Sequence, residues 1–410
     1  MRERVSSLNS YQPAWQGGKA NIDRTLTSTS LFAGMFLYVR RDIMKEFFTS
    51  ESITPGHPDK ICDQIADAIL DAAISVDKYS KVAIEASIKD ELVFIFGEIN
   101  TKADLDYAKI AKDVIKDIGY SEEYEVIEKI SKQSAEINHA VTGSDKTAAG
   151  DQGIMFGYAC DETASFMPLS IELAHLLAKE LHEVFLNQTS NILKPDGKTQ
   201  VTVEYDGSEI KRIDTIVVST QHYENITQSF LKTYIYENVI APVVSKGLLD
   251  KDTKIYVNPS GSFVKGGSFG DSGTTGRKIV VDTYGGHGRI GGGALSSKDP
   301  SKVDRSAAYY TRYVAKNIVA NNLAKKCEIQ VSYAIGMVQP LSININTFNT
   351  STYSEEAILK IVQENFDFSV DNIIKELDLL RPIYRVTANF GHFGRSDISL
   401  PWEEIIELKI

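Results

Sequence analysis

The hydrophobic and polar positions of the chain follow a repeating order of helical and strand-like periods. Residues 58–74 carry isoleucines at helical spacing behind a proline, which is suited to the first turn of a helix. Residues 82–100 contain two strand-like runs with a polar break between them, as in a hairpin. Residues 104–120 return to helical spacing and stop at Gly119. The pattern predicts a helix, a hairpin and a second helix in succession.

The same order occurs twice more along the chain. The second round comprises residues 167–186, 200–222 and 224–244, and the third comprises residues 302–324, 328–347 and 354–377. The sheet segments begin near Val82, Val201 and Ile329, which are 119 and 128 residues apart. This repeat predicts an α+β fold of three structurally similar domains in a pseudo-threefold arrangement, each a β-sheet covered by helices.

We expect an N-terminal α+β domain at 44–145, a central one at 146–265 and a C-terminal one at 266–410. Residues 1–43 hold six cations, three acids and no sustained apolar period, and we interpret them as a leader or tag-like extension, with a targeting segment as the alternative. The longest apolar run, residues 31–39, is far shorter than the roughly 20 residues of a membrane helix. No membrane association is expected.

Two of the predicted strands, in residues 93–99 and 215–220, are apolar along most of their length. A sheet whose helices cover one face has a second face to bury, and these strands are poorly suited to water. Packing against a second subunit would cover them, so we expect an obligate homo-oligomer.

Composition narrows the range of functions. A chain of 410 residues that is 42% hydrophobic and 24% charged is a normal globular protein, and its net charge of −11 argues against nucleic-acid binding. Its three cysteines show no CxxC spacing, which fits free thiols in a reducing cytoplasm and offers no zinc site.

A glycine-rich stretch from Asn258 to Arg305 is the most unusual part of the chain. Twelve of the 33 residues between Gly261 and Gly293 are glycine, where about two would be expected, and the whole stretch carries seven cations and four acids. Glycine backbone can approach a ligand closely and present its N–H groups. A flexible linker is the alternative, but it needs neither these charges nor the apolar run at 279–284, which we interpret as β-structure. The composition predicts a site for a polyanion and its metal ions.

Three other segments carry candidate chemistry. His57 and Asp59 flank a predicted helix start, where phosphate is attracted; His57 could donate to an oxygen gaining charge and Asp59 could hold magnesium, or both could merely form a capping turn. Glu85 and Glu98 lie on one face of the first hairpin if its turn has two residues, and a solvated face is the alternative. Residues 132–153 are polar and aperiodic, as in a mobile lid or an ordinary loop, and residues 194–198 resemble a tight turn.

The motifs GHPDK, AAGDQG, KPDGK, GSFVKGGSFGDSGTTGRK, GGGALSSKDPSKVDRSA and NFGHFGR together resemble those of the S-adenosylmethionine synthetases, from about Phe47 to Trp402. The resemblance implies synthesis of S-adenosylmethionine from ATP and L-methionine by attack of the methionine sulfur on ribose C5′. Tripolyphosphate is then released and hydrolysed to phosphate and diphosphate. It also implies two Mg²⁺ and a K⁺ per site, a cytoplasmic homodimer with active sites at the subunit interface, and pairing of dimers into a homotetramer.

Site residues follow from the same resemblance, motif by motif. The catalytic group is His57, Lys198, Arg277, Lys298 and Lys302. ATP is contacted by His57, Asp196, Gly197, Lys198, Ser262, Phe263, Asp271, Arg277, Lys278, Ala294 and Lys298, with Phe263 stacked on adenine. Methionine is contacted by Glu98, Gln133, Asp151, Asp271 and Lys302. Asp59 and Asp304 are the magnesium carboxylates, and Glu85 is the potassium ligand.

The chain departs from the family pattern at several positions. The loop between Gln133 and Asp151 is shorter than in many members, and Ala148, Leu295 and Ser297 stand where glycine, phenylalanine and glycine are common. None of these changes removes a charge, so we expect the reaction to be retained.

Two other classes of protein are disfavoured by the sequence. A nucleotide-binding NTPase of another class would show GxxxxGK[ST], which is absent, and an RNA-binding module would need interleaved basic and aromatic residues.

Overall fold

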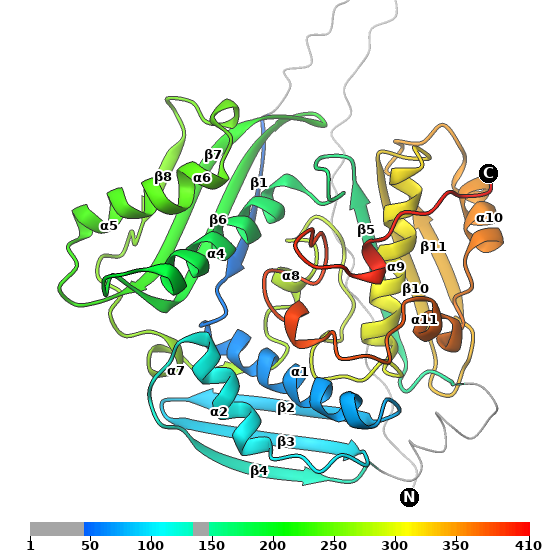
Figure 1. Ribbon diagram of the computed structural model, residues 1–410. Coiled ribbons are helices and arrows are strands. Elements are labelled where there is room, and N and C mark those ends of the chain that lie inside the picture. The colour runs from blue at the N-terminus through cyan, green and yellow to red at the C-terminus, as the bar shows by residue number, and fades with distance from the viewer. Residues whose placement is uncertain (1–44, 134–146) are drawn as a thin grey trace, which may run out of the picture. The chain divides into compact units, whose positions relative to one another are not determined.

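The structure is a computed structural model, and it describes residues 45–133 and 147–410. The predicted leader at 1–43 and most of the predicted lid lie outside the described residues. These described residues form one compact unit that contains three β-sheets (Figure 1).

The first sheet has the order β4-β3-β2-β9, with β2 Lys81–Lys89, β3 Leu92–Asn100, β4 Glu125–Ser131 and β9 Gly273–Thr274. The second has the order β1-β6-β7-β8, with β1 Glu46–Ile53, β6 Leu193–Asp206, β7 Glu209–His222 and β8 Lys254–Val257. The third has the order β11-β10-β5, with β5 Gly153–Cys160, β10 Lys326–Tyr333 and β11 Ser342–Asn346.

Helices cover each sheet in the predicted order. They are α1 Pro58–Val76 and α2 Tyr107–Ile118 for the first sheet, α4 Leu169–Asn187, α5 Gln228–Ile235 and α6 Ala241–Val243 for the second, and α9 Val303–Ala320, α10 Glu355–Asn365 and α11 Val370–Glu376 for the third (Figure 1). The described residues also form short helical turns: α7 Gly267–Gly270, α8 Ile279–Asp282, η1 Tyr236–Ile240, η2 Lys246–Leu248, η3 Arg385–Thr387 and η4 Pro401–Glu403. The α+β class, with helix, hairpin and helix three times over, is confirmed.

Three strands pair with strands that lie far from them in the sequence. β1 pairs with β6, placing Ile53 opposite Lys198. β5 pairs with β10 along its whole length, and β9 pairs with β2. Hydrogen bonding therefore links the segments that we assigned to separate domains, and the linear domain boundaries stay a prediction.

Two local predictions are wrong. Residues 279–284 were expected to form β-structure from their β-branched composition, but α8 is a helical turn in which the N–H of Asp282 donates to the carbonyl of Lys278 at 2.9 Å. Tertiary contacts of Asp282, described below, override the local propensity. Residues 194–198 are not a tight turn. They lie inside β6, where the register against β7 shifts between Leu193 and Gly197.

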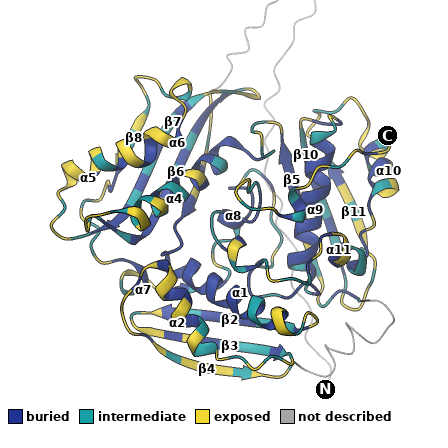
Figure 2. Cartoon of the chain, viewed as in Figure 1, coloured by how far each residue is buried: buried dark blue, intermediate teal, exposed yellow. Residues whose placement is uncertain are grey.

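Helix α1 is buried on nearly every side, including its polar face. Fifteen of its 19 residues are buried, among them Asp59, Lys60, Asp63 and Asp67. In Figure 2 most of α1 has the dark blue of buried residues. The apolar side chains of α1 share one core with the first and third sheets and α9, whereas the second sheet and α4 enclose a separate core. A helix with a buried polar face needs partners for those groups, and the glycine-rich stretch supplies them.

One face of the first sheet remains partly open. Leu92, Phe94 and Ile127 are 39%, 37% and 46% exposed, and Phe94 lies opposite Ile127 in the parallel pairing of β3 with β4. Glu98 shares this face because side chains alternate along β3. In the part of the chain that is described, no helix is long and apolar enough to cross a membrane.

Candidate active site

His57 caps the N-terminus of α1. Its Nδ1 accepts the backbone N–H of Asp59 at 3.2 Å, and the residue is only 4% exposed. Burial, followed by the charges of Lys278 and Lys198, lowers the pKa of His57 from 6.5 to about 3. The ring is therefore neutral at physiological pH, and because Nδ1 is the acceptor, the proton lies on Nε2. His57 can donate that N–H to an oxygen.

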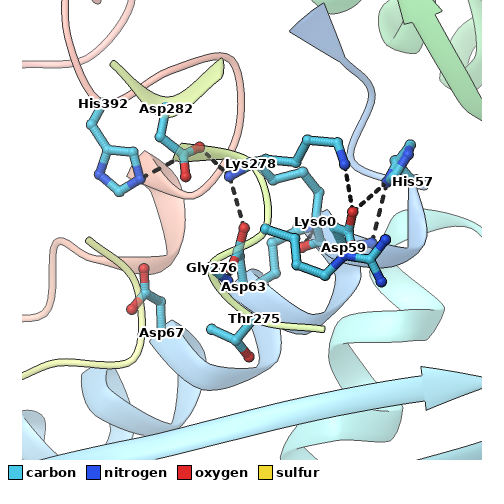
Figure 3. Close-up of polar contacts among 12 residues, drawn as sticks. His57, Asp59, Lys60, Asp63, Asp67, Thr275, Gly276, Lys278, Asp282 and His392 are labelled. Carbon is cyan, nitrogen blue, oxygen red and sulfur yellow. Dashed lines mark hydrogen bonds and ion pairs between the residues drawn. The ribbon is translucent and has the colours of Figure 1, made fainter. Parts of the chain in front are cut away.

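Asp59 faces two cations of the glycine-rich stretch. Its Oδ1 accepts the N–H of Thr274 at 3.0 Å, and Lys278 Nζ lies 2.5 Å from Oδ2 (Figure 3). Arg277 Nε lies 3.4 Å from Oδ1. Burial opposes ionisation of this carboxyl, but the hydrogen bonds from Lys278 and Thr274 outweigh burial and lower the pKa of Asp59. A negative charge is thus held at a helix N-terminus among positive groups.

The irregular part of β6 brings Asp196 to the glycine-rich stretch. Asp196 Oδ2 accepts the N–H of Gly267, the first residue of α7, at 2.8 Å. Burial, only partly offset by the Gly267 hydrogen bond and the charge of Lys198, raises the pKa of Asp196 to about 6. The carbonyl of Gly197 accepts the N–H of Thr54 at 2.9 Å, which fixes this bulge beside the turn before His57.

Backbone pairing places Phe263. Its N–H donates to His222 Nε2 at 3.0 Å, and its carbonyl accepts the N–H of His222 at 3.0 Å. Ser262 next to it is exposed. Asp271, at the end of α7, is also exposed and accepts the N–H of Ser272 at 2.8 Å. Of these three predicted ligand contacts, Ser262 and Asp271 are therefore exposed, whereas Phe263 is partly buried.

A second group forms where residues 297–299 run beside β2. Ser297 Oγ donates to Glu85 Oε1 at 3.0 Å, and Lys298 Nζ lies 2.7 Å from Asp304 Oδ2 in the first turn of α9. An isolated bridge joins Lys298 to Ala83. Burial raises the pKa of Glu85, although the Ser297 hydrogen bond and Lys298 act against it. Glu85, Lys298 and Asp304 are thus brought together.

Lys302 and Ala294, two further predicted site residues, also contact this part of the molecule. Lys302 donates to the buried carboxylate of Asp299 and to the carbonyl of Val82, the latter at 3.2 Å. A Cβ added to Gly276 would lie 2.7 Å from Ala294 Cβ, so these two loops touch.

The three residues proposed for methionine alone are not brought to this group. The hairpin turn has two residues, as required, and the register of Glu85 with Phe96 and of Ala83 with Glu98 puts both glutamates on one face, diagonally adjacent. The backbone N–H of Gln133 donates to Asn100 at 3.2 Å, and Asp151 is exposed. Among the described residues, no hydrogen bond or ion pair joins Glu98, Gln133 or Asp151 to His57 or Asp59.

Sequence reasoning missed the buried charges behind the site. Lys60, Asp63, Asp67 and Asp282 were given no role, although aspartates recur every four residues along the first helix, which places them on one helical face. That spacing was the available signal. Within the described ranges, no group of three or more His, Cys, Asp or Glu side chains is arranged to hold a metal ion.

Comparison with known proteins gives the family. Models for the N-terminal, central and C-terminal domains of S-adenosylmethionine synthetase match residues 45–142, 146–263 and 265–404. This chain belongs to the S-adenosylmethionine synthetase family. A Staphylococcus epidermidis protein named S-adenosylmethionine synthase is 50% identical over 387 residues, covering 89% of this chain and 97% of that protein. A Clostridium tetani protein of the same name is 50% identical over 385 residues, covering 89% of this chain and 98% of that protein. The resemblance drawn from the motifs is confirmed.

Proposed function

We propose that this chain synthesises S-adenosylmethionine from ATP and L-methionine, and then hydrolyses the released tripolyphosphate to phosphate and diphosphate. The observation that carries the proposal is the neutral His57 at the start of α1, with its Nε2–H free to donate and with Lys278, Lys198 and Arg277 around it. A helix N-terminus surrounded by cations suits a polyphosphate.

The methionine sulfur is itself the nucleophile in this reaction, so no serine or cysteine nucleophile is required. As the C5′–O5′ bond breaks, negative charge develops on the departing oxygen. His57 donates its Nε2–H to that oxygen, while Arg277, Lys278 and Lys298 neutralise the polyphosphate. Catalysis is then positioning plus electrostatic stabilisation of the leaving group.

The carboxylates fit magnesium and potassium. Magnesium at phosphate sites is commonly bound by one or two carboxylates together with phosphate oxygens, and single carboxylates at Asp59 and Asp304 suit that pattern. Bound there, it would neutralise further phosphate charge. Glu85, which is partly buried and accepts the Ser297 hydroxyl at one oxygen, would hold the potassium ion.

The remaining contacts are assigned by position. Phe263 and Ser262 would bind adenine, while Asp196, Gly197 and Asp271 would bind ribose, with Ala294 beside the phosphates. Lys198 would reach the phosphates from β6. Methionine would be bound by Glu98, Gln133, Asp151, Asp271 and Lys302.

We further propose a homodimer with active sites between subunits, paired into a homotetramer. Glu98 lies on the same open sheet face as the exposed Leu92 and Phe94, so a partner that covers those apolar side chains would also reach the proposed methionine contacts. Three buried free cysteines are compatible with the cytoplasm as the compartment. Sedimentation that finds only a stable monomer would refute the interface.

The activity is tested by incubating the protein with ATP, methionine, magnesium and potassium and measuring S-adenosylmethionine by chromatography. We expect product that depends on methionine and on both cations. Parallel reactions that lack methionine show any ATP hydrolysis unconnected with synthesis. No methionine-dependent product would refute the proposed function.

A further inference from the structure

Lys60 lies directly behind the candidate active site and is fully buried. Its Nζ donates to Asp63 Oδ2 at 2.9 Å and also to Asp282 Oδ1 (Figure 3). The lysine therefore bridges a carboxyl group of α1 and a carboxyl group of α8.

Asp63 and Asp282 hold the two ends of the segment that carries the proposed polyphosphate cations. The second oxygen of Asp63, Oδ1, accepts the backbone N–H of Gly276 at 2.8 Å. The segment from Gly276 to Asp282 is thus tied to α1 at both ends, through Asp63 at its start and through Lys60 at its end. Arg277 and Lys278, the proposed polyphosphate cations, lie between these two anchors.

Asp63 belongs to a row of aspartates that hold distant loops. Asp59 accepts the N–H of Thr274, Asp63 that of Gly276, Asp67 that of Ser297 at 3.0 Å, and Asp71 those of Tyr384 and Arg385 at 3.0 and 2.8 Å. The four-residue spacing aligns them on one face of α1. The aspartates of α1 therefore hold the backbone of several loops, including the two loops that carry Lys278 and Lys298.

His392 of the NFGHFGR motif closes this network from the other side. Its backbone N–H donates to the carbonyl of Asp282 at 2.9 Å. Its Nδ1 lies 2.8 Å from the hydroxyl of Tyr309, which in turn accepts Arg305 Nε at 3.0 Å. Arg305 is paired with Asp67 on α1 at 2.7 Å through each of two nitrogens. The motif has no proposed ligand contact, yet it supports Asp282.

Stability alone gives no reason for such an arrangement. Taking a lysine and two carboxyl groups out of water is costly, and apolar side chains of similar volume are often as stable or more stable. What ion pairs and charged hydrogen bonds add is fixed direction and distance.

We propose that Lys60, Asp63 and Asp282 are positioning residues that set the Gly276–Asp282 backbone, and with it Arg277 and Lys278, for the polyphosphate. This inference rests on the proposed function. His392 supports the same set through Asp282, which gives the NFGHFGR motif a role at a distance from the substrate.

The test neutralises Lys60, Asp63 and Asp282 together, so that none of them is left as a buried charge without a partner. In the triple variant Lys60→Met/Asp63→Asn/Asp282→Asn the whole set is neutral and of similar volume, so we expect it to fold. Asp63→Asn alone is the milder variant. The matched control is Glu204→Gln, since Glu204 is a buried carboxylate that accepts Arg212 Nε at 2.7 Å and lies 2.8 Å from Lys45 Nζ. Among the described residues it makes no hydrogen bond or ion pair with 274–282.

We expect kcat of the triple variant to fall at least about tenfold while KM for methionine stays within about twofold, because methionine contacts lie elsewhere. Calorimetric affinity for inorganic tripolyphosphate with magnesium should weaken at least about fivefold, whereas the control keeps both values whatever its melting temperature. Unchanged kcat and tripolyphosphate affinity in both variants would overturn the inference, as would equal losses in the control. If the wild-type protein makes no S-adenosylmethionine, the proposed function fails instead. The tripolyphosphate measurement then still decides whether Lys60, Asp63 and Asp282 position Arg277 and Lys278.

Discussion

Ser297 donates its hydroxyl to Glu85 at 3.0 Å while its own backbone holds a φ of 78°. This left-handed conformation favours glycine, and glycine is common at this position in the family pattern noted above. The Ser297 N–H donates to Asp67, and its carbonyl accepts the N–H of Ile84 at 3.2 Å, so the backbone cannot relax. The chain therefore keeps a strained residue whose side chain binds the proposed potassium ligand.

Replacing Ser297 with glycine should leave stability almost unchanged. Relief of the left-handed strain, about 1–2 kcal/mol, offsets loss of a hydrogen bond worth about 0.5–1.5 kcal/mol. The freed oxygen of Glu85 becomes available to a cation, so we expect the potassium concentration for half-maximal activity to fall about two- to fivefold. Melting temperatures and potassium titrations of the rate measure the two effects.

Ser297→Ala is the matched control because it loses the hydroxyl and keeps the strain. It should be less stable than Ser297→Gly by about 1–2 kcal/mol and should show the same shift in potassium dependence. Equal stability of the two variants would contradict the strain at this position. An unchanged potassium titration in both would remove the hydroxyl from the cation site.

Lys298→Met should lower kcat at least about tenfold, because losing a cation at a developing charge costs a few kcal/mol. Lys298 Nζ is 2.7 Å from Asp304, and the side chain is largely buried. Lys179→Met is a suitable control, since Lys179 forms a comparable ion pair with Asp397 at 2.9 Å on another part of the surface. Steady-state rates at saturating ATP and methionine compare them. Full turnover of Lys298→Met would exclude this lysine from the reaction.

The helices and hairpins could be predicted because each buries one face against its own neighbour in the chain. The hairpin of β2 and β3 needs only its alternation and its two-residue turn at 90–91. β1 and β5 could not be placed, since they pair with strands more than 100 residues away and periodicity says nothing about partners. The four-residue turn α8 was misassigned because its helical form depends on Asp282 reaching Lys60.

The residues of the candidate site can likewise be divided into those that the sequence predicted and those that it did not. His57, Asp59, Lys278 and Asp304 were found from motifs, and the structure gives each of them a charged or hydrogen-bonded neighbour that was also predicted. The groups behind them were overlooked because an amphipathic interpretation of α1 assigns its polar face to solvent. That face is buried, and only the fold reveals that Asp63 meets Gly276 rather than water.

His57→Asn separates catalysis from helix capping, the two interpretations that the sequence left open. Asparagine is as good an N-cap as most residues, so it should retain the acceptor that Nδ1 offers to the N–H of Asp59. It lacks a donor at the position of Nε2. We expect stability within about 0.5 kcal/mol of wild type and kcat lower by about 100-fold, as for other lost donors at a developing oxyanion. Thermal unfolding and steady-state kinetics test both, and an active variant would support a capping role alone.

The raised pKa of Asp196 predicts a pH dependence of ATP binding. Burial raises this pKa to about 6, so the carboxylate is ionised at pH 8 and about nine-tenths protonated at pH 5. An ionised Asp196 can accept ribose hydroxyls in addition to the N–H of Gly267, whereas the protonated form loses much of that capacity. We therefore expect KM for ATP to rise about tenfold from pH 8 to pH 5. Asp196→Asn should have a raised KM at pH 8 and a much smaller change between the two pH values. Measuring both proteins in the same buffers cancels the titration of ATP itself, and parallel pH profiles would show that Asp196 does not bind the nucleotide.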